Sequence, residues 1–445
     1  MDAIAPDSIS RFAEHAATTA FEALPAPAVG AARTFILDTL GVGLVGSAGP
    51  HVDGLRAVQR GWGDGDAATV WGSGLRLPAP AAAMCNAYQT HNSEFDCIHE
   101  AAVVHPMSVV LPAALAVAER QGGVSGRDLL AAVVLGVDVA CHLGVAARSG
   151  MKFFRPATAG AFGGTAAAGR LMGFDAGWLT NAFSLAYAQL CGTMQAHAEG
   201  SPVLALQVGF NARNAVSACD LATLDIAAPR QVLEGGFGYF RLFEDEVELA
   251  PVLGELGRVW RITEVAHKPW PSGRATHGIV EACLALQAHH DFAAAEVERI
   301  TARVPPLTHR LVGRPARAGM SVNHARLSAP FAAARALLGR GLGVADFAPA
   351  ALADRDSIAL AHCIEVVEEP GHGPNDLAPV HVDLLLVDGR RFTETVETVY
   401  GSPAKPLGRD AHLAKFRGNC AAALPALPAG RADRLIEAVD GLEAL

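Results

Sequence analysis

Residues 90–106 concentrate the groups that proton transfer needs. This short segment holds three carboxylates and three imidazoles, although only 18% of the chain is charged, and the apolar run 109–115 follows it closely. A carboxylate beside a histidine orients the imidazole and raises its basicity, and partial burial moves the pKa values of both groups toward neutrality. The segment therefore predicts an acid/base site at the edge of a buried helix.

His105 is the candidate base within this segment, and Asp96 is the candidate carboxylate that orients it. Pro106 follows His105, and proline is favoured in the first turn of a helix, so a helix is predicted to begin here. The helix dipole lowers the pKa of an imidazole at that end and favours its neutral form, and the same end attracts an anionic substrate. The alternative interpretation of His105 is a histidine that only caps the helix.

Lys268 is the candidate cation. It precedes the stiff sequence Pro269-Trp270-Pro271, which predicts a fixed side chain, whereas an ordinary surface lysine is the alternative. His277 follows on the next predicted helix. It is expected either to contact substrate or to be a hydrogen-bond partner of segment 90–106.

Metal binding and thiol chemistry are the rival interpretations of the acidic segment. Its carboxylates and imidazoles are types that bind zinc, manganese or iron: Glu94, Asp96, His99 and His105. Their spacing fits no standard metal motif, so the sequence predicts acid/base and substrate contacts and no metal. Cys97 lies among them, but the adjacent carboxylates would raise the pKa of its thiol and disfavour the nucleophilic thiolate.

Residues 41–46 match the pattern G-x-G-x-x-G. A dinucleotide site needs a strand before this pattern and a helix after it, whereas here a helical pattern precedes it. A glycine-rich helix end is therefore predicted, and no phosphate-binding loop or G-x-S-x-G sequence is present. We expect an enzyme that uses no cofactor.

Composition limits the partners. With 445 residues the chain predicts two domains, and its 51% hydrophobic content suggests burial between subunits, so a homodimer is expected. No uninterrupted apolar run of ~18 residues is present, which predicts no membrane span. The net charge of −10 disfavours a nucleic-acid partner. The eight cysteines form no C-x-x-C pair and the start lacks a signal peptide, so a cytoplasmic location with reduced thiols is expected.

Hydrophobic periodicity predicts a mostly α protein with an inserted α+β domain. A large all-helical domain is expected over 1–265, completed by 405–445, and a smaller α+β lid domain over 266–404. Helices are predicted at 33–45, 109–118, 129–146, 160–172, 275–289, 330–338, 410–424 and 431–442. Strands are predicted at 258–262, 300–304, 364–367 and 380–387, the last turning at Asp388-Gly389 into 391–396.

Several short sequences together resemble one family. They are Glu94-Phe95-Asp96 with His105-Pro106, then residues 156–163, 206–212, 234–240, 268–272 with 276–277, 401–407 and 415–416. In this order, and over nearly the whole chain, they resemble the MmgE/PrpD family, which includes 2-methylcitrate dehydratase, cis-aconitate decarboxylase and iminodisuccinate epimerase. The resemblance implies a two-domain plan with the active site in the cleft between the domains. It also implies catalytic roles for His105 and Lys268.

Three positions depart from the family pattern. Arg155 stands where a histidine is common, Leu204 where a lysine is common, and Phe331 where an aromatic hydroxyl is common. Arginine cannot act as a base at neutral pH, but it binds a carboxylate through two parallel hydrogen bonds. Arg155 is therefore predicted to be a carboxylate clamp, and proton-transfer groups are lost.

The predicted site combines both lines of argument. The catalytic residues are predicted to be His105, Asp96 and Lys268. The substrate-binding residues are predicted to be Glu94, His99, Arg155, Thr158, Gln207 and His277.

The predicted activity is a cofactor-independent lyase that removes a proton next to a carboxylate of a small di- or tricarboxylate. Water elimination, as in a 2-methylcitrate dehydratase, ranks first. Epimerisation or isomerisation of a dicarboxylate ranks next, and decarboxylation last, because the departures remove proton-transfer groups. A carboxylate-binding protein that has lost catalysis is the alternative outside enzymes.

Overall fold

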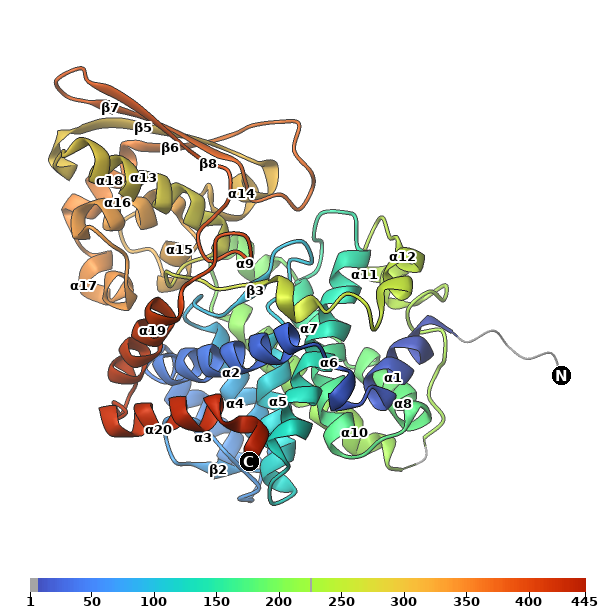
Figure 1. The fold of residues 1–445 in the computed structure, drawn as a ribbon. Helices are drawn as coiled ribbons and strands as arrows, with labels where there is room; N and C mark the ends of the chain where they lie inside the picture. The colour runs from blue at the N-terminus through green and yellow to red at the C-terminus, as the bar shows by residue number, and fades with distance from the viewer. Residues whose placement is uncertain (1–6, 225) are drawn as a thin grey trace.

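The computed structural model describes residues 7–224 and 226–445, and two hydrophobic cores organise them (Figure 1). The larger, here the helical core, is built from described residues between 9 and 265, Leu327 and the C-terminal helices. The smaller, here the sheet core, is built from residues between 275 and 399. The predicted class, mostly α with an α+β part, is confirmed. The limits 1–265 with 405–445, and 266–404, stay a prediction.

Helix α7 (Arg155–Leu171) forms the centre of the helical core. It packs against its neighbours α5 (Met107–Arg120), α6 (Gly126–Ala146), α8 (Ala176–Tyr187) and α10 (Val203–Ala222). A Cβ atom on Gly163 would lie 2.5 Å from the carbonyl oxygen of Gly136 on α6, so these two helices touch by their backbones. Small residues at this crossing let the two helices approach closely.

Other helices surround this centre. They are α1 (Ser8–Thr18), α2 (Ala26–Gly46), α3 (Val52–Gly61), α4 (Ala79–His91), α9 (Gln195–Glu199), α11 (Tyr239–Phe243) and α12 (Leu249–Glu255). The glycine-rich residues 41–46 lie inside α2, as predicted, and not in a loop after a strand. By length and composition α2 and α6 could each cross a membrane, but the most apolar stretch of α6 is 94% buried inside the protein. Such burial is typical of core helices.

The sheet core has one four-stranded sheet. Its order is β6 (Ile364–Glu368), β5 (Val297–Val304), β7 (Val380–Leu386) and β8 (Arg391–Val396), with β5 and β6 parallel and the other pairs antiparallel. Gly389 takes a φ of 87° in the predicted hairpin turn between β7 and β8. Helices α13 (His277–His290), α16 (Ala329–Gly339) and α18 (Arg355–His362) cover one face (Figure 1).

The prediction of a strand at 258–262 is wrong. The chain there forms a turn and the 3₁₀ helix η2 (Arg261–Glu264). The backbone N–H of Arg261 donates to Asp138 Oδ1 of α6 at 2.8 Å, so a side chain takes the place of a neighbouring strand. Alternation of apolar and polar residues cannot make a strand where no partner strand satisfies the backbone.

A two-residue ladder after η2 joins distant parts of the chain. Strand β4 (Val265–Ala266) pairs with β3 (Ile98–His99) in antiparallel register. The ladder brings the acidic segment 90–106 beside Lys268. It is the local structure that assembles the candidate site.

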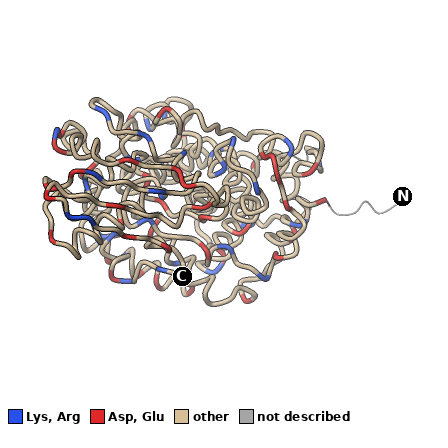
Figure 2. The backbone as a smooth tube through the Cα atoms, turned by 90° about the horizontal axis from the view of Figure 1, so that it is seen from above, with Lys and Arg blue, Asp and Glu red and all other residues tan. Residues whose placement is uncertain are grey.

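The C-terminal helices return to the helical core, as predicted. Helices α19 (Arg409–Ala422) and α20 (Ala429–Asp440) pack on α2, where the red and blue ends of the chain lie side by side (Figure 1). Acidic and basic residues are interspersed along the described chain (Figure 2). The expectations of no nucleic-acid and no membrane partner stay predictions.

Candidate active site

The loop between α4 and α5 carries the acidic segment and is held in a strained shape. Glu94 and Val103 take φ values of 51° and 50°, in a region that side chains other than glycine rarely adopt. The β3–β4 ladder and a bridge between His99 and Val104 hold the loop at its middle. Strain of this kind persists only where the surroundings enforce it, and it often marks a functional site.

Asp96 is the centre of the site. Its Oδ2 atom lies 2.8 Å from Nδ1 of His91 and 3.2 Å from Nδ1 of His105, and it accepts a hydrogen bond from the Ser108 hydroxyl. The side chain of Asp96 is fully buried. One carboxylate oxygen therefore orients His91 through a hydrogen bond and lies against Nδ1 of His105, and both rings line the same cavity.

Lys268 supplies the positive charge. Its Nζ atom donates to Glu94 Oε2 at 3.0 Å and to the Glu94 carbonyl oxygen at 3.2 Å, and it lies 3.6 Å from Asp96 Oδ1. Lys268 is fully buried. A buried lysine between two buried carboxylates offsets their charge. The structure thus brings together four of the predicted residues, Glu94, Asp96, His105 and Lys268.

The two imidazoles differ in their protonation. Burial lowers the pKa of His105, and Lys268 adds to this effect, so the pKa lies below its ordinary value despite Asp96. Burial also lowers the pKa of His91, but the charge and hydrogen bond of Asp96 outweigh it, so the pKa of His91 is raised. A neutral imidazole and a more readily protonated one thus stand with ring centroids 5.0 Å apart.

The carboxylates stay ionised. Burial alone would raise the pKa of Asp96, but His105, His91 and Lys268 together hold it well below its usual range. Burial likewise opposes ionisation of Glu94, while Lys268 and His91 lower its pKa to about 2. The site therefore holds two negative charges at neutral pH, next to a lysine and an imidazole that can be cationic.

A narrow cavity of about 60 Å³ opens beside these groups and between the two cores. His91, Glu94 and His105 line it from the helical core, and residues 273–275 and 311–312 line it from the other side. Nε2 of His91 is buried there without a hydrogen-bond partner. A substrate between the cores would therefore meet His91 and His105 together.

Two other predicted residues support the site without lining this cavity. Nε2 of His99 lies 2.8 Å from Glu264 Oε2, which anchors the loop to η2. His277 is fully buried and lies 3.4 Å from Arg274 Nη1 and 3.3 Å from the Ser272 carbonyl oxygen. The structure gives His277 partners other than segment 90–106, which was one of its two expected roles.

Arg155 already holds a carboxylate of the protein. Its Nε and Nη2 atoms donate to the two carboxylate oxygens of Glu244, each at 2.9 Å, and its side chain is 1% exposed. It also donates to the carbonyl oxygens of Ala102 and Ser149 at 3.2 Å. The expected two-point geometry exists, but Glu244 occupies it in place of a substrate.

The remaining predicted contacts are also satisfied within the protein. Thr158 lies 3.2 Å from the Tyr239 hydroxyl, and Gln207 bonds to the backbone of Thr193. Of the positions that differ from the family pattern, Leu204 lines the cavity, whereas Phe331 is fully buried in the sheet core.

Three residues of the site were not predicted from the sequence: His91, Ser108 and Glu244. His91 lies in the quoted segment, but as the last residue of α4 it gave no sign of facing Asp96. Glu244 follows the family-like sequence 234–240 and is the first of several acidic residues there. Its pairing with Arg155 spans 89 residues, which spacing alone does not predict.

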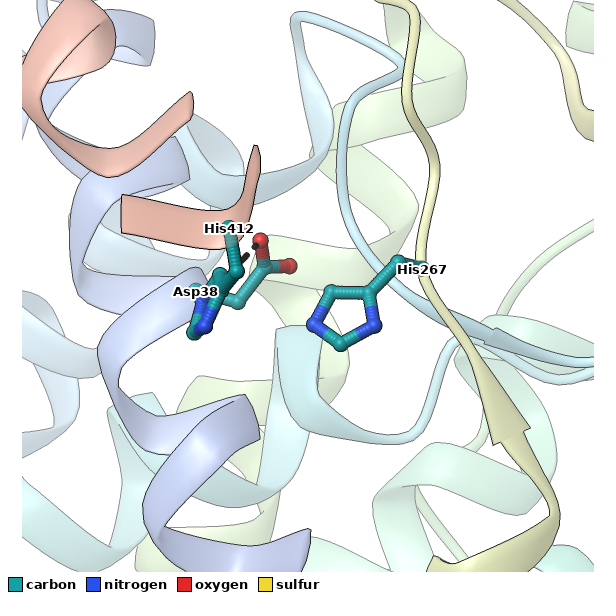
Figure 3. A group of neighbouring side chains, drawn as sticks. All are labelled: Asp38, His267 and His412. Carbon is teal, nitrogen blue, oxygen red and sulfur yellow. Dashed lines mark ion pairs between the residues drawn. The ribbon is translucent and has the colours of Figure 1, made fainter. Parts of the chain in front are cut away.

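A second buried cluster backs the loop. Asp38 of α2, His267 and His412 of α19 converge (Figure 3), and Lys415 Nζ lies 2.7 Å from Asp38 Oδ1 and 3.0 Å from the Phe95 carbonyl oxygen. Burial lowers the pKa of His267 to about 3 although Asp38 opposes this, so its imidazole is neutral. This cluster ties helix α19 to Phe95, the residue between Glu94 and Asp96.

Two groups of side chains in the described chain have the composition of metal ligands: His91, Asp96 and His105, and Asp38, His267 and His412. In each group a lysine already stands against the carboxylate, at 3.6 Å from Asp96 and 2.7 Å from Asp38. An ammonium group so close repels a metal cation. The absence of a metal or other cofactor requirement stays a prediction.

Comparison with known proteins decides the family. The MmgE/PrpD N-terminal domain matches residues 10–251, and the MmgE/PrpD C-terminal domain matches residues 270–443. The chain belongs to the MmgE/PrpD family. The resemblance found in the short sequences is confirmed.

Relatives within the MmgE/PrpD family share about the same length. The chain is 29% identical over 431 residues to cis-aconitate decarboxylase of Mus musculus, covering 93% of this chain and 86% of the relative. It is 29% identical over 429 residues to cis-aconitate decarboxylase of Homo sapiens, covering 93% and 87%. It is 28% identical over 415 residues to the cis-aconitate decarboxylase-like protein oryM of Aspergillus oryzae, covering 85% and 83%. Because decarboxylases are lyases, a lyase-type function fits this MmgE/PrpD protein.

Proposed function

We propose that this protein is a cofactor-independent dehydratase that acts on a small di- or tricarboxylate. The observation that carries the proposal is the pair of imidazoles on one oxygen of Asp96, with His91 Nδ1 at 2.8 Å and His105 Nδ1 at 3.2 Å. Elimination of water needs a base for the C–H bond and an acid for the leaving hydroxyl group. The two rings offer both at one cavity.

His105 acts as the base. With Nδ1 turned to Asp96, its Nε2 carries the lone pair that takes the proton from the carbon next to the substrate carboxylate. The electron pair of that C–H bond develops negative charge on the substrate. Protonated His91 lines the cavity and stabilises this charge, while the Lys268 ammonium, paired with Glu94 and Asp96, contributes its positive field from behind them.

His91 acts as the acid. As the carbon–carbon double bond forms, the bond to the β-hydroxyl group breaks, and the His91 Nε2 proton passes to the departing oxygen to give water. Glu94 Oε1 lies 3.8 Å from this nitrogen and favours its protonated form before the reaction. The cycle leaves His105 protonated and His91 neutral, and exchange with solvent restores both.

Decarboxylation is the second candidate, because the relatives named above are cis-aconitate decarboxylases. Against it stand Arg155, Leu204 and Phe331, which replace proton-transfer groups common in the family. Epimerisation would share the first proton removal and differ only in the face that is reprotonated. A homodimer and a cytoplasmic location are further expectations for this enzyme.

The deciding experiment is a screen of C4 to C7 di- and tricarboxylates in deuterated water, followed by NMR. Loss of the hydroxyl group with an alkene product supports the dehydratase, and the wild type is compared with His105→Gln. Release of carbon dioxide would identify a decarboxylase, and deuterium incorporation with inversion an epimerase. Absence of exchange at any substrate carbon would overturn the proposal in favour of a binding protein without catalysis.

A further inference from the structure

The walls of the candidate cavity are mostly apolar. Beyond the acid/base groups, its lining is dominated by hydrocarbon side chains from both cores: Ile98, Val103, Met151, Phe154, Pro156, Leu204, Leu311, Val312, Leu327 and Leu377. Most are buried, and Leu204 lies where family members often carry a lysine. Such a surface favours a hydrocarbon group and disfavours a bare charge.

Positive charge near the cavity is already committed to protein acceptors. Among the described residues that line it, Arg274 alone carries a permanent positive charge. Its guanidinium donates to the Glu100 carboxylate and to the carbonyl oxygens of His267, Tyr400 and Val399. Four of the five N–H donors of this side chain are thus committed to the protein, and one Nη2 donor is left for a substrate carboxylate.

Two neighbouring cations are also paired with carboxylates of the protein. Lys268 is held by Glu94 and Asp96, and Arg155 is held by Glu244. His197 also lines the cavity, but burial and the charge of Arg314 lower the pKa of its imidazole to about 4, so it is neutral. The acid/base pair and the remaining Arg274 donor are therefore left to stabilise two carboxylates, and a third carboxylate would be buried without a partner.

We propose that the substrate carries an apolar arm of a few carbons where a tricarboxylate carries a further carboxylate, and that this arm packs against Val103, Leu204 and Leu327. This inference rests on the proposed function, because the reacting carboxylate is placed beside His91 and His105. It narrows the substrate class to carboxylates with an alkyl substituent.

A matched pair of compounds tests the arm. In 2-isobutylmalate an isobutyl group replaces the carboxymethyl group of citrate with nearly the same shape. We expect wild-type enzyme to favour 2-isobutylmalate over citrate in kcat/KM by about 10²-fold, because an apolar pocket rejects an unpaired charge. Calorimetry with the His105→Gln variant measures the same preference as binding, without turnover.

Charge variants in the wall give the second arm of the test. Leu204→Lys should shift the preference toward citrate by at least about 10-fold. Leu311→Lys, at a half-buried wall position, serves the same purpose if the first variant does not fold. Leu221→Lys adds the same charge on the exposed side of α10, where leucine is 39% exposed, and should leave the preference unchanged.

The outcomes separate the two proposals. Binding and turnover of 2-isobutylmalate ahead of citrate support both. Proton exchange on citrate ahead of 2-isobutylmalate, or tighter binding of citrate, overturns the arm and leaves the acid/base proposal standing. Preferential binding of 2-isobutylmalate without any exchange supports the arm and overturns the dehydratase. Binding of neither compound overturns the arm.

Discussion

Lys268 donates two hydrogen bonds to Glu94, with Nζ 3.0 Å from a carboxylate oxygen and 3.2 Å from the main-chain carbonyl oxygen. The main-chain bond fixes a residue whose φ is 51°, and the side-chain bond neutralises its buried charge. The same lysine thus shapes the loop and sets its electrostatics.

His105→Gln should lower turnover by ~10²- to 10⁴-fold, the usual range for the loss of a general base. Glutamine keeps the polar shape but cannot take the proton. Steady-state kinetics together with circular dichroism check this. His289→Gln, at a mostly exposed position on α13, is the matched control and should behave as wild type. Full activity of a folded His105→Gln variant would rule out His105 as the base.

Activity should depend on pH through both imidazoles. The pKa of His105 is lowered from its ordinary value of 6.5, so the base stays neutral down to a pH below 6.5. The acidic limb of the kcat/KM profile should therefore lie below pH 6.5. The pKa of His91 is raised from 6.5, so the acid stays protonated up to a pH above 6.5. The basic limb of the same profile should therefore lie above pH 6.5. A pH series for wild type and His91→Gln measures this. Persistence of the basic limb in His91→Gln would assign it to another group.

Lys268→Met should destabilise the fold by about 3–5 kcal/mol, because it leaves Glu94 and Asp96 buried without their cation. Both kcat and KM should also suffer, since the lysine stands beside the reacting groups. Denaturant unfolding near neutral pH and kinetics on the folded fraction provide the measurements. Lys152→Met removes an exposed lysine paired with Asp245 and should cost less than about 1 kcal/mol. Similar losses for the two variants would show that Lys268 is an ordinary surface lysine.

Acid should weaken the native state through Glu94. Its pKa falls from 4.5 to about 2 on folding, so the stability it contributes is fully present above the unfolded value of 4.5. That contribution is lost as pH falls from 4.5 toward about 2. Glu94→Gln should therefore flatten the pH dependence of unfolding free energy in this window. An unchanged slope would show that Glu94 is not stabilised in its ionised form.

Arg155→Lys should lose stability by about 3–5 kcal/mol, because a point charge cannot replace two parallel bonds to buried Glu244. The loss of activity should be equal for a dicarboxylate and its mono-amide, since the guanidinium holds a protein carboxylate. Thermal unfolding and kinetics on both compounds test this. A loss confined to the dicarboxylate would restore the clamp role expected from the sequence.

The helices of the site were predictable because apolar residues recur at helical spacing along α5, α6 and α7. The closeness of His105 and Asp96 was also predictable, since a short loop joins them. The contact between Glu94 and Lys268 spans 174 residues and was not predicted, because the family resemblance placed the two residues in one site without pairing them. The environment of Arg155 was not predictable, because its partner lies after a helix of five residues that shows little periodicity. Residues 258–262 show the same limit, since their backbone is satisfied by Asp138 and not by a strand.

The β3–β4 ladder has a consequence for the order in which the enzyme is made. His91, Asp96 and His105 leave the ribosome long before Lys268 does, and the ladder that brings Lys268 to them needs Val265 and Ala266. Until then the carboxylates of Glu94 and Asp96 in the nascent chain lack the lysine that would pair with them when they are buried. The candidate site therefore stays unassembled during most of translation, and under the proposed function proton transfer begins only when the later part of the chain docks.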